Sequence, residues 1–244
     1  MLAAYHAVRW HCNMPALKES VLYSGGMKLK AEIRSKCPSL VSKRVAVDDR
    51  IEAILDAATK VIMEHGYAKA STREIARNAG ASKETFYQRF PSKASLFAAL
   101  IERQSDRLLC PIAHALEEEK DPYKVLTLFG ERLLTVLMNP ESERLLQVVI
   151  AESSEFPELA AAFWDKGPGL GRELLRAYFK RLAKQGQMRK EDIEFASEQF
   201  LGALVGSIAL RRNLAMPAYL PNAKAVHVWV QKTVDWFLRA HLIV

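Results

Sequence analysis

Side chains that donate hydrogen bonds recur at short intervals between positions 71 and 93 of this 244-residue sequence. Four of them carry the hydroxyl or ammonium groups that commonly contact phosphate: Thr72, Thr85, Tyr87 and Lys93. Three more carry groups that reach base edges in a DNA groove: Arg73, Lys83 and Gln88. Ser71 and Ser82 complete the set, because each precedes a helical pattern. The expected chemistry is hydrogen bonding to a nucleic acid.

Two short helices joined by a tight turn are predicted to hold these side chains. Ser71 and Glu74 have the spacing of a capping box, so the first helix is expected to begin at Thr72. Its apolar side is formed by Ile75, Ala76 and Ala79. Gly80 suits the left-handed conformation that ends a helix, and it is expected to turn the chain.

The second short helix is predicted to start after Ser82. Phe86 and Phe90 lie four residues apart and share one face, which leaves the polar side chains on the other face. Pro91 is expected to stop this helix, and Ser92 can cap the next one. The pattern predicts a helix-turn-helix, with an ordinary three-helix core capped by serines as the alternative.

A longer helix is predicted upstream, from Arg50 to Tyr67. Its apolar stripe comprises Ile51, Ile54, Leu55, Ala58, Val61 and Ile62. The stripe is long enough to brace two short helices, and Gly66 is expected to end it.

The span from about residue 48 to 100 resembles the N-terminal domain of TetR/AcrR-type transcriptional repressors. The matching stretches are ILDAA at 54–58, His65-Gly66-Tyr67, 73–76, 79–83 and the segment from Thr85 to Leu96. This resemblance implies a double-stranded DNA operator as partner, a homodimer, and release from DNA when a small apolar or cationic effector binds.

Positive charge is concentrated in the first part of the chain. Residues 27–93 hold 14 Lys and Arg against 8 Asp and Glu, whereas residues 94–244 hold 19 of each. Localised positive charge is expected where a protein meets phosphates, although a solvated basic face without such a partner has the same composition. Residues 1–47 show no sustained period and are expected to be a basic arm, which lies along DNA or only aids solubility.

The cysteines and histidines predict no metal site and no cofactor. Cys12, Cys37 and Cys110 lack ligand-like spacing, and His6 and His11 have no fourth ligand nearby. The cysteine usage fits a reducing cytoplasm. The sequence shows neither an apolar run expected to span a bilayer nor a hydrophobic leader core, so a cytoplasmic protein without a membrane partner is expected.

The remainder of the chain is predicted to be helical, with no strand pattern. A connecting helix follows Lys93 and is expected to be kinked or ended by Pro111. The predicted fold is all-α, with a helix-turn-helix domain at 48–94 and a larger helical domain at 95–244 for effector binding and dimerisation.

Large apolar residues in the second domain suit a ligand pocket between helices, although core packing explains them equally well. The candidate lining residues are Phe129, Leu133, Phe163, Trp164, Tyr178 and Phe200. Gln147 or Glu152 is expected to supply a polar group that orients the ligand.

The last two helices are predicted to pair with their copies in a second chain, or to pack only within one chain. The candidate interface residues are Gly202, Gly206, Trp229, Thr233, Trp236 and Phe237. Small residues at 202 and 206 permit a close helix approach.

No enzyme is expected, because the sequence has no glycine-rich phosphate loop, paired metal ligands or nucleophile elbow. The alternatives to an effector-released repressor are a helix-turn-helix used for protein contacts and a ligand-independent activator.

Overall fold

The computed structural model describes residues 49–189, 193–216, 220 and 222–243, so the predicted arm at 1–47 lies outside the described residues. The helices are α2 (Asp49–Lys69), α3 (Thr72–Asn78), α4 (Lys83–Arg89), α5 (Lys93–Glu118), α6 (Pro122–Leu137), α7 (Pro140–Glu152), α8 (Pro157–Lys166), α9 (Pro168–Lys184), α10 (Ile193–Asn213) and α11 (Ala223–His241). Within these ranges the sole β-type pairing is an isolated bridge between Met188 and Leu242, and the all-α prediction is confirmed.

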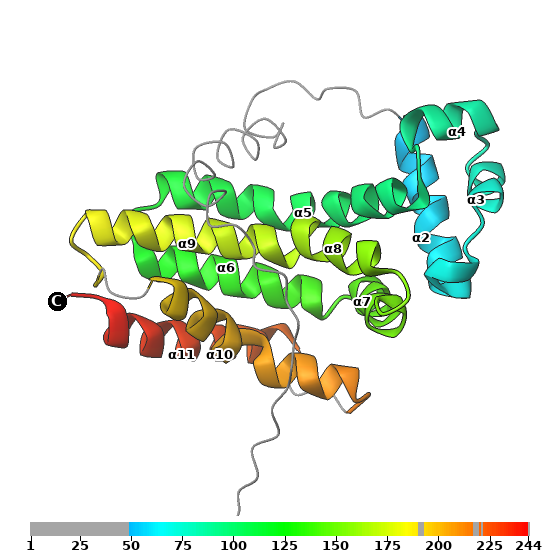
Figure 1. The fold of residues 1–244 in the computed structure, drawn as a ribbon. Coiled ribbons are helices and arrows are strands. Elements are labelled where there is room, and N and C mark those ends of the chain that lie inside the picture. The colour runs from blue at the N-terminus through cyan, green and yellow to red at the C-terminus, as the bar shows by residue number, and fades with distance from the viewer. Residues whose placement is uncertain (1–48, 190–192, 217–219, 221, 244) are drawn as a thin grey trace, which may run out of the picture.

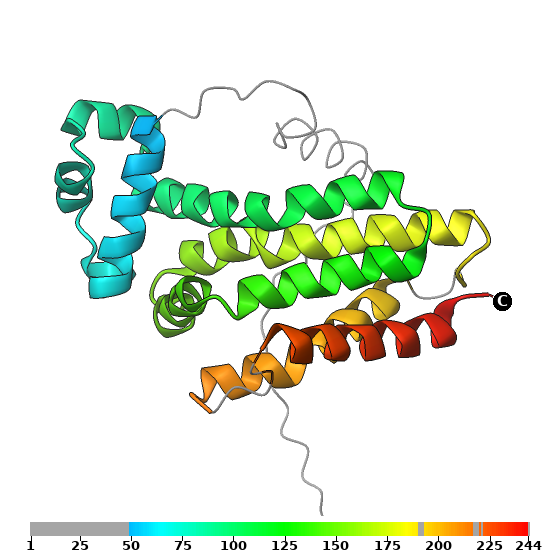
Figure 2. The ribbon, with the colours of Figure 1, turned by 180° about the vertical axis from the view of Figure 1, so that it is seen from behind.

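The helices form an elongated body with a small three-helix unit at one end. Helices α2, α3 and α4 form that end, and α5 runs from it along the length of the body (Figure 1). Helices α8 and α9 follow one another beside α5, while α10 and α11 lie on the opposite side, against α6 (Figures 1 and 2). The long helix α5 therefore belongs to both ends of the molecule.

Two clusters of buried side chains stabilise this arrangement. The first joins α2, α3 and α4 to the start of α5 and also takes in Leu145, Val149 and Leu159 from α7 and α8. The second fills the space among α5, α6, α9, α10 and α11, with Phe129, Phe179 and Phe200 fully buried. Because α7 and α8 contribute to the first cluster, the three-helix unit shares its apolar core with the rest of the fold.

Local capping signals set most helix starts as expected. The Oγ atoms of Ser71 and Ser82 accept from the amides of Glu74 and Thr85 at 3.5 and 3.1 Å. The full reciprocal capping box is made by Ser92 and Ser95 instead.

Pro111 does not end its helix. Helix α5 continues from Lys93 through Pro111 to Glu118, so of the two expected effects of Pro111, a kink or an end of the helix, the end is wrong. Leu109, Ile112 and Leu116 around this proline are buried, and this apolar packing offsets the helical hydrogen bond that proline cannot donate.

Gly130 sets the distance between α6 and α11. A Cβ at this position would lie 2.8 Å from Cγ1 of Val230 and 3.3 Å from Cδ2 of Leu204, and both neighbours are fully buried. We expect Gly130→Ala to lower the free energy of unfolding by about 1–3 kcal/mol, because Val230 cannot move without displacing the core. Urea denaturation followed by circular dichroism measures the change.

Gly171 provides the matched control for this test. A Cβ there meets nothing within 4 Å, so Gly171→Ala should raise stability by up to about 1 kcal/mol through its helix propensity. A stability change of the same sign in both variants would refute the packing explanation.

Candidate nucleic-acid interface and adjoining pocket

Helix α4 presents an outward polar face, as its sequence predicts. Phe86 and Phe90 are buried, whereas Lys83, Tyr87 and Gln88 are exposed, with Tyr87 43% accessible. Ser71, Arg73 and Ser82 are exposed as well, and Thr72 and Thr85 are half-buried. The face stands at the end of the molecule, where α3 and α4 project (Figure 1).

Hydroxyl contacts fix the relative position of the two short helices. Tyr87 Oη and Thr72 Oγ1 lie 3.0 Å apart, which joins the outer face of α4 to the first turn of α3. The Tyr87 ring also packs edge-on against Phe86 at 5.4 Å. Two of the predicted phosphate contacts are thus adjacent, beside a helix N-terminus that favours anions.

Lys93 is turned inward in this structure. Its Nζ donates to the carbonyl of Ala68 at 3.0 Å and lies 4.6 Å from the centre of the Tyr67 ring. Burial lowers the pKa of Lys93, and the nearby carboxylate of Glu152 opposes that shift. Contact of Lys93 with a DNA phosphate remains a prediction, and its structural role here is to join the start of α5 to the end of α2.

Glu152 joins the end of α7 to the same point. Its two carboxylate oxygens accept from the backbone amides of Tyr67 and Ala68, at 2.9 and 2.6 Å. Gly66 makes this possible, because its φ of +80° aims both amides at the carboxylate and a Cβ there would collide with Oε1 of Glu152. Position 66 therefore requires glycine for two reasons: the positive φ, and the absence of a Cβ that would collide with Glu152.

A second set of polar contacts, made by Arg103, connects α2 with α5. The guanidinium of Arg103 donates to Glu52 at 3.1 Å and to Asp56 at 2.7 Å, and its side chain is 10% accessible. A further donation reaches Thr59 Oγ1 at 3.3 Å. Helix α2 is therefore held by charged groups from both α5 and α7.

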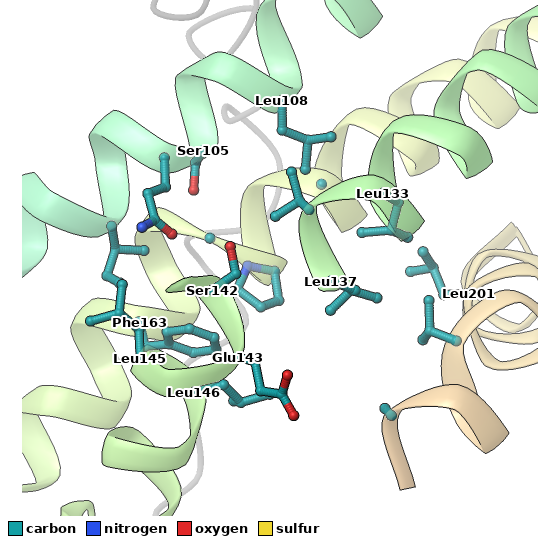
Figure 3. A pocket seen from close by; sticks show the side chains of 18 of the residues that line it. Ser105, Leu108, Leu133, Leu137, Ser142, Glu143, Leu145, Leu146, Phe163 and Leu201 are labelled. Carbon is teal, nitrogen blue, oxygen red and sulfur yellow. The ribbon is translucent and has the colours of Figure 1, made fainter. Parts of the chain in front are cut away.

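An apolar cavity of 240 Å³ opens among α5, α6, α7, α9 and α10, with Phe163 of α8 on its wall. Leucine side chains from four of these helices face one another across it, and the carboxylate of Glu143 lies at its edge (Figure 3). Arg172 and Arg212 also line the cavity, and Arg212 pairs with Glu143. Such a lining, mostly apolar with a few polar groups, is suited to a small organic ligand.

Three of the predicted ligand residues line this cavity: Phe129, Leu133 and Phe163. The other five lie elsewhere. Phe200 and Tyr178 belong to the core, Gln147 is exposed, and Trp164 is 49% accessible with the Arg172 guanidinium 4.7 Å from its ring. Glu152 does not line this cavity, and its carboxylate binds the backbone amides of Tyr67 and Ala68 instead.

Tyr178 is a core residue that carries a polar group. Its side chain is buried in the larger cluster, its hydroxyl has no hydrogen-bond partner among the described residues, and burial raises its pKa to about 12.

No signal in the sequence indicated the pair of Arg212 and Glu143, because the two residues lie 69 positions apart.

The exposed side of α10 and α11 carries an apolar strip. Gly202 and Gly206 have open space where a Cβ would be, and Leu210 and Trp236 are 60% and 79% accessible. Of the other predicted interface residues, Phe237 is buried against Phe179 and Phe200, and Thr233 is half-buried. Half-buried Trp229 donates to the carbonyl of Leu204 at 3.1 Å, so these inward side chains hold α11 within its own chain.

Helix α10 has the length and apolar composition of a membrane-crossing helix, which the sequence reading did not anticipate. Core helices of soluble proteins have the same length and composition, and here 33% of the apolar stretch is buried. Its buried side meets α9, α6 and α11, and its open side carries the small-residue strip.

Comparison with known proteins gives the following matches. Residues 54–100 match the family described as bacterial regulatory proteins, tetR family, and residues 124–241 match the AefR-like transcriptional repressor C-terminal domain. The chain is similar to the nucleoid occlusion factor SlmA of Vibrio cholerae, with 27% identity over 74% of this chain and 92% of SlmA. It is also similar to the HTH-type transcriptional activator FasR of Mycolicibacterium smegmatis, with 38% identity over 32% of this chain and 36% of FasR.

A solved structure has the same fold. The crystal structure of a putative TetR-family transcriptional regulator from Mesorhizobium loti aligns with a TM-score of 0.69 at 24% identity, covering 81% of this chain and 100% of that one.

The contact between Glu152 and the two amides can be tested directly. Glu152→Gln keeps the shape but removes the charge, so we expect the free energy of unfolding to fall by about 1–3 kcal/mol and amide exchange at Tyr67 and Ala68 to accelerate. Hydrogen exchange read by NMR measures both. The exposed Glu155 supplies the control, and equal effects of Glu155→Gln would contradict the assigned contact.

Proposed function

Because the chain belongs to the TetR family of transcriptional regulators, we propose that it is a sequence-specific repressor that a small molecule releases from its operator. The observation that carries the proposal is the exposed polar face of α4, with Lys83, Tyr87 and Gln88 outside the core. A helix of this kind enters the major groove, where hydroxyls position it on phosphates and longer side chains read base edges. Because this function requires access to chromosomal DNA, the proposal includes a cytoplasmic location.

Two copies are needed for specific binding. One short helix reads few base pairs, and paired recognition helices must stand about 34–36 Å apart to meet successive turns of one DNA face. The strip formed by Gly202, Gly206, Leu210 and Trp236 suits this pairing, because a second copy would bury apolar side chains that are otherwise exposed.

The position of the cavity supports release of the protein from DNA by an effector. The cavity wall includes Gln104 of α5 and Leu145 of α7. The same two helices bind α2, through the ion pair of Arg103 with Asp56 and through the hydrogen bonds of Glu152 with the Tyr67 and Ala68 amides. Gln104 donates to Glu141 at 2.9 Å and links α5 with α7 directly. A ligand that moves α5 relative to α7 would therefore change the position of α2 and the spacing of the recognition helices.

The size of the effect is set by differential affinity. A ligand with equal affinity for both spacings shifts nothing, so the effector must favour the spacing that does not fit DNA by a few kcal/mol. FasR is a transcriptional activator, so the similarity to it makes activation the alternative to repression. A reporter gene placed behind the recovered operator shows whether the protein raises or lowers transcription.

The DNA-binding proposal is tested by sequencing genomic fragments retained by the protein and titrating the recovered operator at several salt concentrations. We expect affinity to fall steeply with salt, because phosphate contacts release counterions. Tyr87→Phe should weaken operator and unrelated DNA alike, whereas Gln88→Ala should reduce discrimination by about 1–3 kcal/mol. Salt-independent binding, or equal loss of discrimination in both variants, would defeat the assignment.

Dimerisation is tested at Gly206. Gly206→Leu places a large side chain in the strip that a second copy must approach closely, so we expect monomers or aggregates by sedimentation at micromolar concentration, with operator affinity lost. Arg132→Leu, at an exposed position on α6, is the control and should leave the dimer intact. A monomeric mass for the unaltered protein would refute the interface.

A further inference from the structure

We propose that the effector is an acidic amphipathic molecule. Its apolar tail would lie in the cavity, and its anionic head would replace Glu143 as the ion-pair partner of Arg212. This inference rests on the proposed function, since it names the ligand class of the same cavity. It differs from the apolar or cationic effector that the family resemblance implies. The argument comes from the charges on the wall.

The cavity wall combines a long apolar surface with one internal ion pair. Arg212 lies in the last turn of α10, and its guanidinium pairs with the carboxylate of Glu143 in the first turn of α7. Arg212 is 18% accessible and Glu143 34% accessible, so Glu143 is the partner that reaches water more easily. Both side chains line the cavity. The carboxylate of Glu143 therefore occupies the position in which a ligand carboxylate would bind.

The charge balance of the wall favours an anion over a cation. Arg172 and Arg212 line the cavity with one acidic residue, Glu143, and each guanidinium is paired: Arg172 with Glu198, which does not line the cavity, and Arg212 with Glu143, which does. The first turn of α7, with Ser142 on the wall, also directs the positive end of a helix dipole to this side. A ligand anion that replaced Glu143 would keep Arg212 paired, while Glu143 could turn to solvent. A ligand cation would have to displace Arg212, the more buried partner.

Charge exchange at this pair also explains how a ligand would act on the fold. In the described state the pair joins α10 to α7, and α7 ends at Glu152, which holds the backbone after Gly66. Replacement of Glu143 by a free anion removes the bond between α7 and α10. With this contact removed, α7 can shift against α10 while Glu152 still joins it to the backbone after Gly66, so the position of α2 shifts with it.

The test uses three probes that share one tail: decanoate, decan-1-ol and decylammonium. Binding to the full-length protein is measured by calorimetry, with Trp164 fluorescence as a second signal because its ring stacks on Arg172. We expect decanoate to bind about ten-fold more tightly, or better, than either other probe. Equal or tighter binding of the alcohol or the amine overturns the inference, and so does the absence of binding by all three.

Substitutions test whether the anionic head group binds Arg212. Arg212→Met keeps an apolar stem and should weaken decanoate about ten-fold while changing decan-1-ol less than about three-fold. Arg132→Met, at an exposed position outside the cavity, should change neither. Unaltered decanoate affinity in a folded Arg212→Met protein, checked by thermal melting, overturns the proposal.

A second variant keeps the test decisive if Arg212→Met fails to fold. Glu143→Gln removes the internal competitor, so decanoate affinity should rise several-fold, and an unchanged or lower affinity overturns the inference. Failure of the proposed function gives a different result. If decanoate binds through Arg212 but does not release the operator, the ligand class stands and the effector role falls. If the ligand-free protein binds no operator, the DNA-binding role falls.

Discussion

The contact between the Glu152 carboxylate and the amides of Tyr67 and Ala68 determines how the DNA-proximal helices sit on the body. A left-handed residue at position 66 exposes two successive N–H groups, and a carboxylate is a strong acceptor for such a pair. Lys93 binds the same turn by donating to the Ala68 carbonyl. Three helices, α2, α5 and α7, therefore converge on one short stretch of backbone.

The convergence has a consequence for regulation. A DNA-binding unit attached by one flexible linker would respond little to events in a distant cavity. Here α2 is held by charged groups at two points, Arg103 and Glu152, and its apolar side shares a core with α7 and α8. Under the proposed mechanism, movement of α5 against α7 would be transmitted to α2, because packed side chains exchange between discrete arrangements rather than stretch.

Helix α10 contributes to two surfaces of the molecule. One side carries Leu201, Ile208 and Arg212, which line the cavity, and the other carries Gly202 and Gly206, which are open. An apolar surface on nearly all sides gives this helix the composition of a membrane segment. Its position between a cavity and the strip assigned to a second copy accounts for that composition in a DNA-binding regulator.

The sequence by itself determined the features that depend on neighbours within a few residues. Ser82 and Asn222 cap their helices, Gly80 and Gly186 take positive φ, and Phe86 and Phe90 turn inward, because capping, chirality and helical periodicity act locally. Pro111 does not end its helix, because tertiary packing offsets its local cost. The partners of Glu152 and Arg212 lie 85 and 69 positions away, and only the tertiary structure could select them, since any carboxylate satisfies a distant donor equally well until the fold fixes which one is near.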